Sequence, residues 1–190
     1  MRNKTSTIRL TISALLVAIG ILIPMIMPVK IMIEPASFTL ASHLPIFIAI
    51  FLSPKIAVVV SLFTAFGFLI AGFPIVITMR ALSHVVFAYV GSILIKGRHK
   101  DILESPLKSQ TFSALLALIH AVAEVLVVSL FFFGAVPGAN YQDGFFYAVF
   151  LLVGVGTFIH SMVDFILAQL VWRVLYNRMS WVRGLLDSEH

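Results

Sequence analysis

The 190-residue sequence contains no cysteine, and this absence excludes disulfide bonds, thiolate metal sites and thiol nucleophiles. Charged residues are also scarce, at 11% of the chain, whereas 61% of the residues are hydrophobic. A soluble domain of this length has no interior large enough to bury so much apolar surface. The mean hydropathy of +1.08 therefore indicates an integral membrane protein.

The sequence also lacks the G-x-x-x-x-G-K-[ST] phosphate-binding loop, which excludes ATP hydrolysis through that motif. Its polar residues are scattered rather than arranged as nucleophile, base and orienting group. We therefore expect no catalytic residue and no cofactor in this chain. A membrane enzyme that uses a histidine with Glu124 as an acid–base pair is the competing hypothesis.

The chain length sets the expected number of membrane crossings. At roughly 20 apolar residues per spanning helix, it accommodates about six helices in one compact transmembrane domain, residues 1–190. Proline, glycine and charged segments mark the expected helix ends. We predict an all-α bundle of six transmembrane helices over residues 8–27, 39–52, 56–71, 75–95, 111–133 and 145–176.

The distribution of basic residues predicts how this bundle is oriented. Only Lys30 lies in a loop on the presumed outer side, and the opposite side carries Arg2, Lys4, Arg9, Lys55, Lys96, Arg98, Lys100, Lys108, Arg173, Arg178 and Arg183. The positive-inside rule then places both termini in the cytoplasm of a multi-pass cell-membrane protein. Because orientation accounts for the basic charge, we expect the lipid bilayer and no nucleic acid as its partner.

Ionisable residues recur inside the predicted membrane helices. Three pairs are spaced by four residues, which places both members on one helix face: Arg80 with His84, His120 with Glu124, and His160 with Asp164. His43 lies near the start of the second predicted helix. An arginine at mid-bilayer costs about 2.5–3.5 kcal/mol on insertion scales, so it requires a partner or a ligand.

The expected depths of these residues describe a pocket that opens outward. At 1.5 Å per residue, Arg80 lies roughly 8 Å and Glu124 roughly 15 Å below the outer surface. The histidines at 84, 120 and 160 fall near the middle and form a floor. Asp164 lies closer to the cytoplasm, and we expect it mainly to hold the ring of His160.

An anionic ligand explains Arg80 well. A carboxylate accepts two hydrogen bonds from a guanidinium, and walls rich in Phe, Leu and Val suit a flat aromatic body, so the pattern predicts a small aromatic acid. If Glu124 neutralises Arg80, a neutral or cationic ligand such as nicotinamide or a pyridoxine-like vitamin becomes the alternative. The histidines also suit a carrier of zinc, nickel or copper, and a proton relay is a further alternative. Because Arg80 would repel a metal cation, we expect no metal site.

At this point the sequence resembles a known family. Six short helices with both termini inside and no ATPase motif are similar to the substrate-binding S components of energy-coupling factor (ECF) vitamin transporters. The family's A-x-x-x-A motif is matched by Ala14 and Ala18 in "SALLVAIG", where small residues one turn apart let another helix approach closely. Ser13 and Gly20 are expected to extend this smooth strip. The stretches "EPASFTLASHLPIFIAIFLSP" and "AGFPIVITMRALSHVVFAYVG" most resemble the niacin-specific members.

The resemblance implies a subunit that captures niacin outside and pairs with a membrane-embedded coupling protein and two ATPase subunits. Related members handle queuosine precursors or tryptophan. By analogy, residues 28–38 form a lid containing Lys30, Met32 and Glu34, with the apolar "IMI" over the ligand ring, and later loops add Asn140 and Tyr141 to the site. Nanomolar capture of a ligand of about nine heavy atoms needs about −12 kcal/mol, close to the ceiling of about −1.5 kcal/mol per atom. Such a ligand must be enclosed in a dry pocket.

Overall fold

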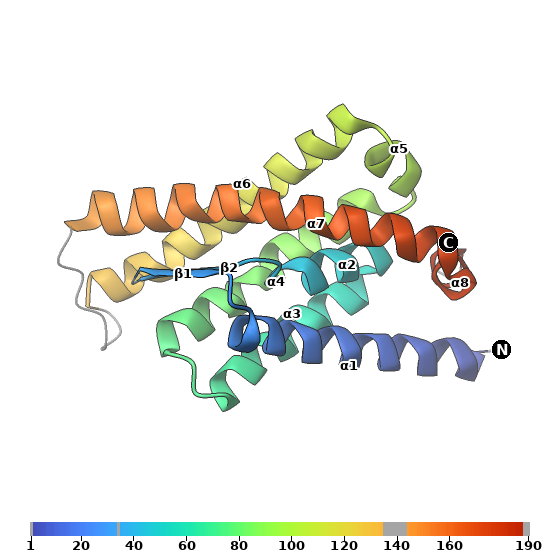
Figure 1. Cartoon of the computed structure of the whole chain (residues 1–190), viewed down its shortest axis with the longest axis horizontal. Coiled ribbons are helices and arrows are strands. Elements are labelled where there is room, and N and C mark those ends of the chain that lie inside the picture. Colours follow the sequence, from blue (N-terminus) through green and yellow to red (C-terminus); the bar gives the residue numbers. More distant parts are fainter. Residues whose placement is uncertain (1, 34, 135–143, 188–190) are drawn as a thin grey trace.

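The computed structural model describes residues 2–33, 35–134 and 144–187 (Figure 1). A short β-hairpin follows the first helix, and all later elements are helical. In chain order the elements are α1 (Arg2–Ile26), β1 (Lys30–Ile33), β2 (Ala36–Thr39), α2 (Leu44–Leu52), α3 (Pro54–Ile70), α4 (Ile75–Ile95), α5 (His99–Leu103), α6 (Pro106–Phe132), the π-helix η1 (Phe146–Val155), α7 (Gly156–Arg178) and α8 (Ser180–Asp187).

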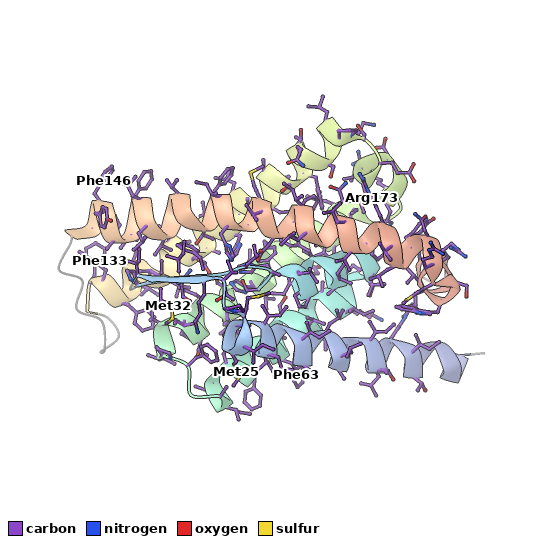
Figure 2. All side chains as sticks on the ribbon, in the orientation of Figure 1. Met25, Met32, Phe63, Phe133, Phe146 and Arg173 are labelled. Atoms are coloured by element: carbon purple, nitrogen blue, oxygen red, sulfur yellow. The ribbon has the colours of Figure 1, made fainter. Side chains whose placement is uncertain are left out.

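Long apolar helices define a multi-pass helical membrane protein. Within the described residues, 4 stretches are long and apolar enough to cross a bilayer, namely Ser6–Ile26, Ile75–Ile95, Pro106–Phe132 and the continuous run Phe146–Arg178. α3 is also apolar but has 17 residues. Large apolar side chains cover the periphery: Phe63 is 56%, Phe133 72% and Phe146 65% exposed, and all are labelled in Figure 2. Such a surface is suited to lipid.

The predicted second helix, residues 39–52, is wrong at its start. Thr39 ends β2, where it pairs with Lys30 of β1, and Ala41 adopts a left-handed φ of 66° that interrupts any helix. α2 therefore begins only at Leu44. Its nine residues rise by about 14 Å, less than half of the roughly 30 Å hydrocarbon core, so α2 alone does not cross a bilayer.

α2 instead forms the centre of the bundle. Every residue from Pro45 to Leu52 is buried, which is the pattern of a helix surrounded by other helices. Phe47 and Phe51 both meet the ring of Phe165 from α7 edge to face, with ring centroids 5.3 and 5.7 Å apart. Such pairs add about 0.5–1.5 kcal/mol each beyond the area they bury. This apolar core supports the polar residues that begin just before α2.

The ends of the chain lie together. Figure 1 shows the N- and C-terminal ends of the described chain, α5 and α8 at one end of the bundle, and the α3–α4 connection at the other. α5 and the first turn of α6 occupy the polar segment before residue 111, where no helix was predicted. The hairpin likewise replaces the irregular connection expected between the first two helices.

Close helix packing at Gly91 yields a stability prediction. A Cβ at this position of α4 would lie 2.8 Å from Leu116 Cδ1 of α6 and 3.4 Å from Ile50 Cγ2 of α2. We expect Gly91→Val to overpack this three-helix contact and to lower the free energy of unfolding by about 1–3 kcal/mol. Thermal denaturation in detergent measures the change.

Gly184 supplies the matched control, because a Cβ added there meets no atom within 4 Å. Gly184→Val should leave the melting temperature within a degree or two of the parent protein. An equal loss in both variants would contradict the packing argument.

Candidate ligand-binding site

A small polar cavity lies where the hairpin, α2, α4, α6 and α7 converge. Its volume is about 50 Å³, enough for a few water molecules. It is lined by Pro24, Ser37, Thr39, Ser42, His43, Ile46, Thr64, Phe68, Phe73, Ile77, Arg80, Ala81, His84, Glu124, Thr157 and His160. We call this cavity and its lining the chamber. Ligand pockets commonly reach about 300–1,000 Å³, so an organic ligand would require the lining side chains to move apart.

The strongest interaction in the chamber joins Arg80 of α4 to Glu124 of α6. Arg80 Nη2 donates to Glu124 Oε2 over 2.8 Å, and both side chains are almost completely buried. Arg80 Nη1 donates to the carbonyl oxygen of Pro35 in the hairpin turn, also over 2.8 Å. Arg80 Nε has no hydrogen-bond partner among the described residues. The guanidinium therefore retains a buried N–H group at Nε that could donate a hydrogen bond to a ligand oxygen.

Glu124 is surrounded by donors from three segments. The hydroxyl of Thr157, at the start of α7, donates to Oε2 over 2.6 Å. His84 Nε2 lies 3.2 Å and His120 Nε2 3.4 Å from Oε1. Thr157 lies two residues after the end of the π-helix η1, and π-helical segments often occur at functional sites. The carboxylate thus ties α4, α6 and α7 together at one point.

Four histidine rings form a compact cluster, with the ring of His43 at its centre. The His43 ring lies edge-on to those of His84, His120 and His160, with centroids 4.8, 4.6 and 5.0 Å away. His120 is fully buried and stacks on Phe87 at 4.5 Å. Neither of its ring nitrogens makes a hydrogen bond within the described part of the chain. The cluster therefore presents ring nitrogens that can bind a ligand.

Asp164 of α7 anchors the segment that leads into α2. Its carboxylate accepts hydrogen bonds from the backbone N–H of Ala41 at 2.7 Å and of His43 at 2.9 Å. It also lies 3.0 Å from His43 Nδ1, whereas His160 Nε2 is 3.4 Å away. The expected role of holding the His160 ring is thus only a small part of what Asp164 does. It fixes the strained Ala41 backbone and the position of His43.

The hairpin covers the chamber with its second strand. β1 is exposed along its whole length, including Lys30 and Met32, whereas β2 contributes Ser37 and Thr39 to the chamber lining. Ile31–Ile33 lie on the exposed strand in this structure, and the covering of a bound ligand by these residues stays a prediction. A Cβ at Gly156 of α7 would lie 2.5 Å from Phe38 Cζ, so the absence of a side chain there makes room for the Phe38 ring. Glu34 lies outside the described residues.

The structure brings most of the expected site residues together. Arg80, His84, Glu124, His43 and His160 line the chamber, and His120 touches two of these rings. Asn140 and Tyr141 lie outside the described residues. Hydroxyl residues are common in membrane helices and carry no distinguishing pattern, so the sequence did not predict the chamber-lining Ser37, Thr39, Ser42, Thr64 and Thr157.

Two residue sets have the composition of a metal site. The ligand atoms of His43, His84 and His120 lie within 4.8 Å of one another, as do those of His43, His160 and Asp164. Both sets share His43, which already pairs with Asp164. Beside the first set, the positive charge of Arg80 is balanced by its bond to Glu124, so net charge does not decide between a cation and an organic ligand. The same ring nitrogens can hydrogen-bond a polar organic ligand instead.

A chamber of paired charges and free ring nitrogens within a helical bundle, covered by a hairpin, defines a membrane protein that binds a small polar molecule. No family model matches the chain, and no solved structure matches it. The niacin transporter NiaX of Lactococcus lactis subsp. cremoris (strain MG1363) is 41% identical over 173 residues, which cover 91% of this chain and 77% of the relative. The chain therefore belongs to the NiaX family of S components of ECF transporters.

The anchoring by Asp164 generates a testable prediction. We expect Asp164→Asn to lower the free energy of unfolding by about 1–3 kcal/mol, because an amide cannot accept all the buried N–H groups that the carboxylate satisfies. Thermal denaturation of the ligand-free protein in detergent measures this change.

Asp101→Asn is the matched control, since Asp101 is exposed and pairs with Lys108 and Arg98 on the surface. Exposed ion pairs contribute about 0–1 kcal/mol, so its melting temperature should barely change. If Asp164→Asn proved as harmless as the control, the anchoring role would be refuted.

Proposed function

We propose that this chain is the niacin-binding subunit of an ECF-type importer and captures nicotinate from outside the cell. The chamber is a small site with one arginine and several ring nitrogens, which suits a planar heteroaromatic acid. The relative that shares 41% of its residues is named a niacin transporter. The observation that carries the proposal is the buried Arg80, whose Nε–H has no partner among the described residues.

Arg80 is proposed to bind the ligand carboxylate. A carboxylate that accepts from Nε and a neighbouring Nη–H forms two parallel, charge-assisted hydrogen bonds. Glu124 now occupies Nη2, so the ligand must share the guanidinium or displace this carboxylate from it. Glu124 would keep the Thr157 hydroxyl and the His84 ring as partners if it moved aside.

The rest of the ligand is proposed to lie among apolar and imidazole groups. Phe68 and Phe73 stack on each other at 4.6 Å and line the chamber together with Ile46 and Ile77. These side chains suit the faces of an aromatic ring. His120 Nδ1, which has no hydrogen-bond partner among the described residues, can donate to the pyridine nitrogen, or accept from it when that nitrogen is protonated.

The hairpin is proposed to act as the lid, with its position linked to Arg80. The Pro35 carbonyl in the hairpin turn accepts from the guanidinium that would bind the ligand. A ligand that reorients Arg80 therefore acts directly on the lid. Ser37 and Thr39 of β2 would close over the bound ligand.

We further propose six membrane crossings with both termini in the cytoplasm. The basic residues gather near the chain ends and the α4–α6 connection, in agreement with the positive-inside rule. Under this proposal β2, the following turn and α2 together provide the second crossing, because α2 alone is too short, and α3 provides the third. ATP-driven uptake then requires a membrane-embedded coupling protein and two ATPase subunits.

The outer face of α1 is the proposed docking surface for the coupling protein. Ala14 and Ala18 are exposed, beside Leu10 and Leu15, which are 72% and 59% exposed. Gly20, by contrast, faces α3, because a Cβ there would lie 2.9 Å from Thr64 Oγ1. Ser13 is buried as well, so neither residue extends the outer strip as expected.

The binding proposal is tested by calorimetric titration of the detergent-purified protein with nicotinate and with nicotinamide, its neutral counterpart. Tight binding of nicotinate with weak binding of nicotinamide is expected if Arg80 binds a carboxylate. Equal affinity would mean that Glu124 retains Arg80, and the neutral-ligand alternative would replace the proposal. Binding of neither compound would refute the niacin assignment.

Substitution of Arg80 tests the same proposal at one residue. Arg80→Ala should weaken nicotinate binding by about 2–5 kcal/mol, because it removes the buried charge-assisted contact. The preference for nicotinate over nicotinamide should disappear with it. Arg173→Ala, which changes an exposed arginine outside the chamber, should bind like the parent protein. An Arg80→Ala variant that still prefers nicotinate would contradict the assigned role.

Ala14→Trp tests the docking surface on α1. We expect uptake of labelled niacin by cells to fall to background, because the indole would keep the partner helix away, while nicotinate binding by the purified protein stays unchanged. Leu170→Trp, an equally exposed position on α7, is the control and should still support uptake. Normal uptake by Ala14→Trp would place the partner elsewhere.

A further inference from the structure

Among the described residues, the ionisable groups that line the chamber or contact its lining come from three helices and one turn. α4 contributes Arg80 and His84, α6 contributes His120 and Glu124, and α7 contributes His160 and Asp164. The turn before α2 contributes His43, which pairs with Asp164. The other lining residues, from α1, α3 and the hairpin, are uncharged: Pro24, Ser37, Thr39, Thr64 and Phe68.

These groups leave no spare positive charge for an anion. With neutral histidines, the single positive charge of Arg80, paired with Glu124, stands against two carboxylates, because Asp164 beside His43 carries a second negative charge, and the sum is negative. With a protonated His43 beside Asp164, the two buried pairs balance. A monocarboxylate adds one further negative charge in either case, and an uncompensated charge in such a buried site is costly.

We propose that Glu124 makes the capture of a monocarboxylate proton-coupled, so that nicotinate enters the chamber together with one proton. This inference rests on the proposed function. The proton would be held by Glu124 itself, by the His84 or His120 ring that faces it, or by the ring nitrogen of the ligand. Glu124 is thereby a residue that determines which charge state of ligand and protein is bound.

Glu124 rather than Asp164 is the carboxylate that can exchange its partners, and so take up a proton, when the ligand binds. Asp164 accepts from two backbone N–H groups and the His43 ring, and these contacts hold the turn before α2. Within the described part of the chain, Glu124 accepts from no backbone group; its partners are the side chains of Arg80, Thr157 and His84, with His120 Nε2 3.4 Å away. Once the ligand takes Arg80, Glu124 loses its closest cation while it remains in contact with two imidazoles.

Calorimetry in buffers of different ionisation enthalpy counts the protons directly. At pH 8, the observed binding enthalpy of nicotinate plotted against the buffer ionisation enthalpy should have a slope that corresponds to about one proton taken up. Nicotinamide, which brings no charge, should give a slope near zero wherever it binds measurably. Glu124→Gln should bind nicotinate with a slope near zero, because Arg80 then balances the ligand. Glu104→Gln, an exposed control, should keep the slope of the parent protein.

The affinity of the unmodified protein provides a second readout that needs no variant. For a one-proton coupling, the Kd for nicotinate should rise by about tenfold per pH unit between pH 8 and 9. A zero slope in the parent protein, an unchanged slope in Glu124→Gln, or a pH-independent Kd would overturn the inference while niacin binding itself stood. Absence of nicotinate binding in every buffer would instead overturn the proposed function, and the inference with it.

Discussion

The buried ion pair between Arg80 and Glu124 is the interaction on which the remaining structure of the chamber depends. An arginine inside a membrane helix needs a counter-charge, and Glu124 supplies it from the neighbouring helix at 2.8 Å. The same guanidinium bonds the hairpin through Pro35, and the same carboxylate bonds α7 through Thr157. One pair of opposite charges therefore joins two membrane helices, a third helix and the hairpin. Buried pairs of this kind contribute little net stability, because desolvation offsets their attraction, so stability alone does not account for the Arg80–Glu124 pair.

The fold provides the conditions that such a pair requires. α2 is too short to cross the bilayer, and its buried Phe47 and Phe51 hold the centre of the bundle. The turn before α2 places His43 in contact with three other histidine rings, while Asp164 fixes that turn from α7. The polar network is consequently enclosed by apolar packing below and by β2 above. This enclosure strengthens every electrostatic contact within the chamber and gives a small ligand few routes of escape.

Much of the site could be predicted from residue spacing. Arg80 with His84, His120 with Glu124, and His160 with Asp164 lie one turn apart on three helices, and ionisable groups in membrane helices must face the protein interior. What spacing could not predict were contacts between elements. The pairing of Arg80 with Glu124 was an alternative that followed from their expected depths, whereas the backbone N–H groups that donate to Asp164 and the contact from the Thr157 hydroxyl depend on how the helices pack. The β-hairpin was missed because "KIMI" and "ASFT" are short and apolar, and such runs do not distinguish strand from loop or helix. The start of α2 was missed because no residue in "TLASHLP" is of a type, such as glycine, that indicates the positive φ found at Ala41.

The central claim is that the guanidinium of Arg80 exchanges its bond to Glu124 for the carboxylate of nicotinate. An experimental structure of the protein with bound nicotinate tests it most directly. The account predicts the ligand carboxylate within hydrogen-bond distance of Arg80, the ring between the phenylalanine side chains and the histidine cluster, and Glu124 still bonded to His84 or Thr157. A structure in which nicotinate binds away from Arg80, with the Arg80–Glu124 pair unchanged, would contradict it.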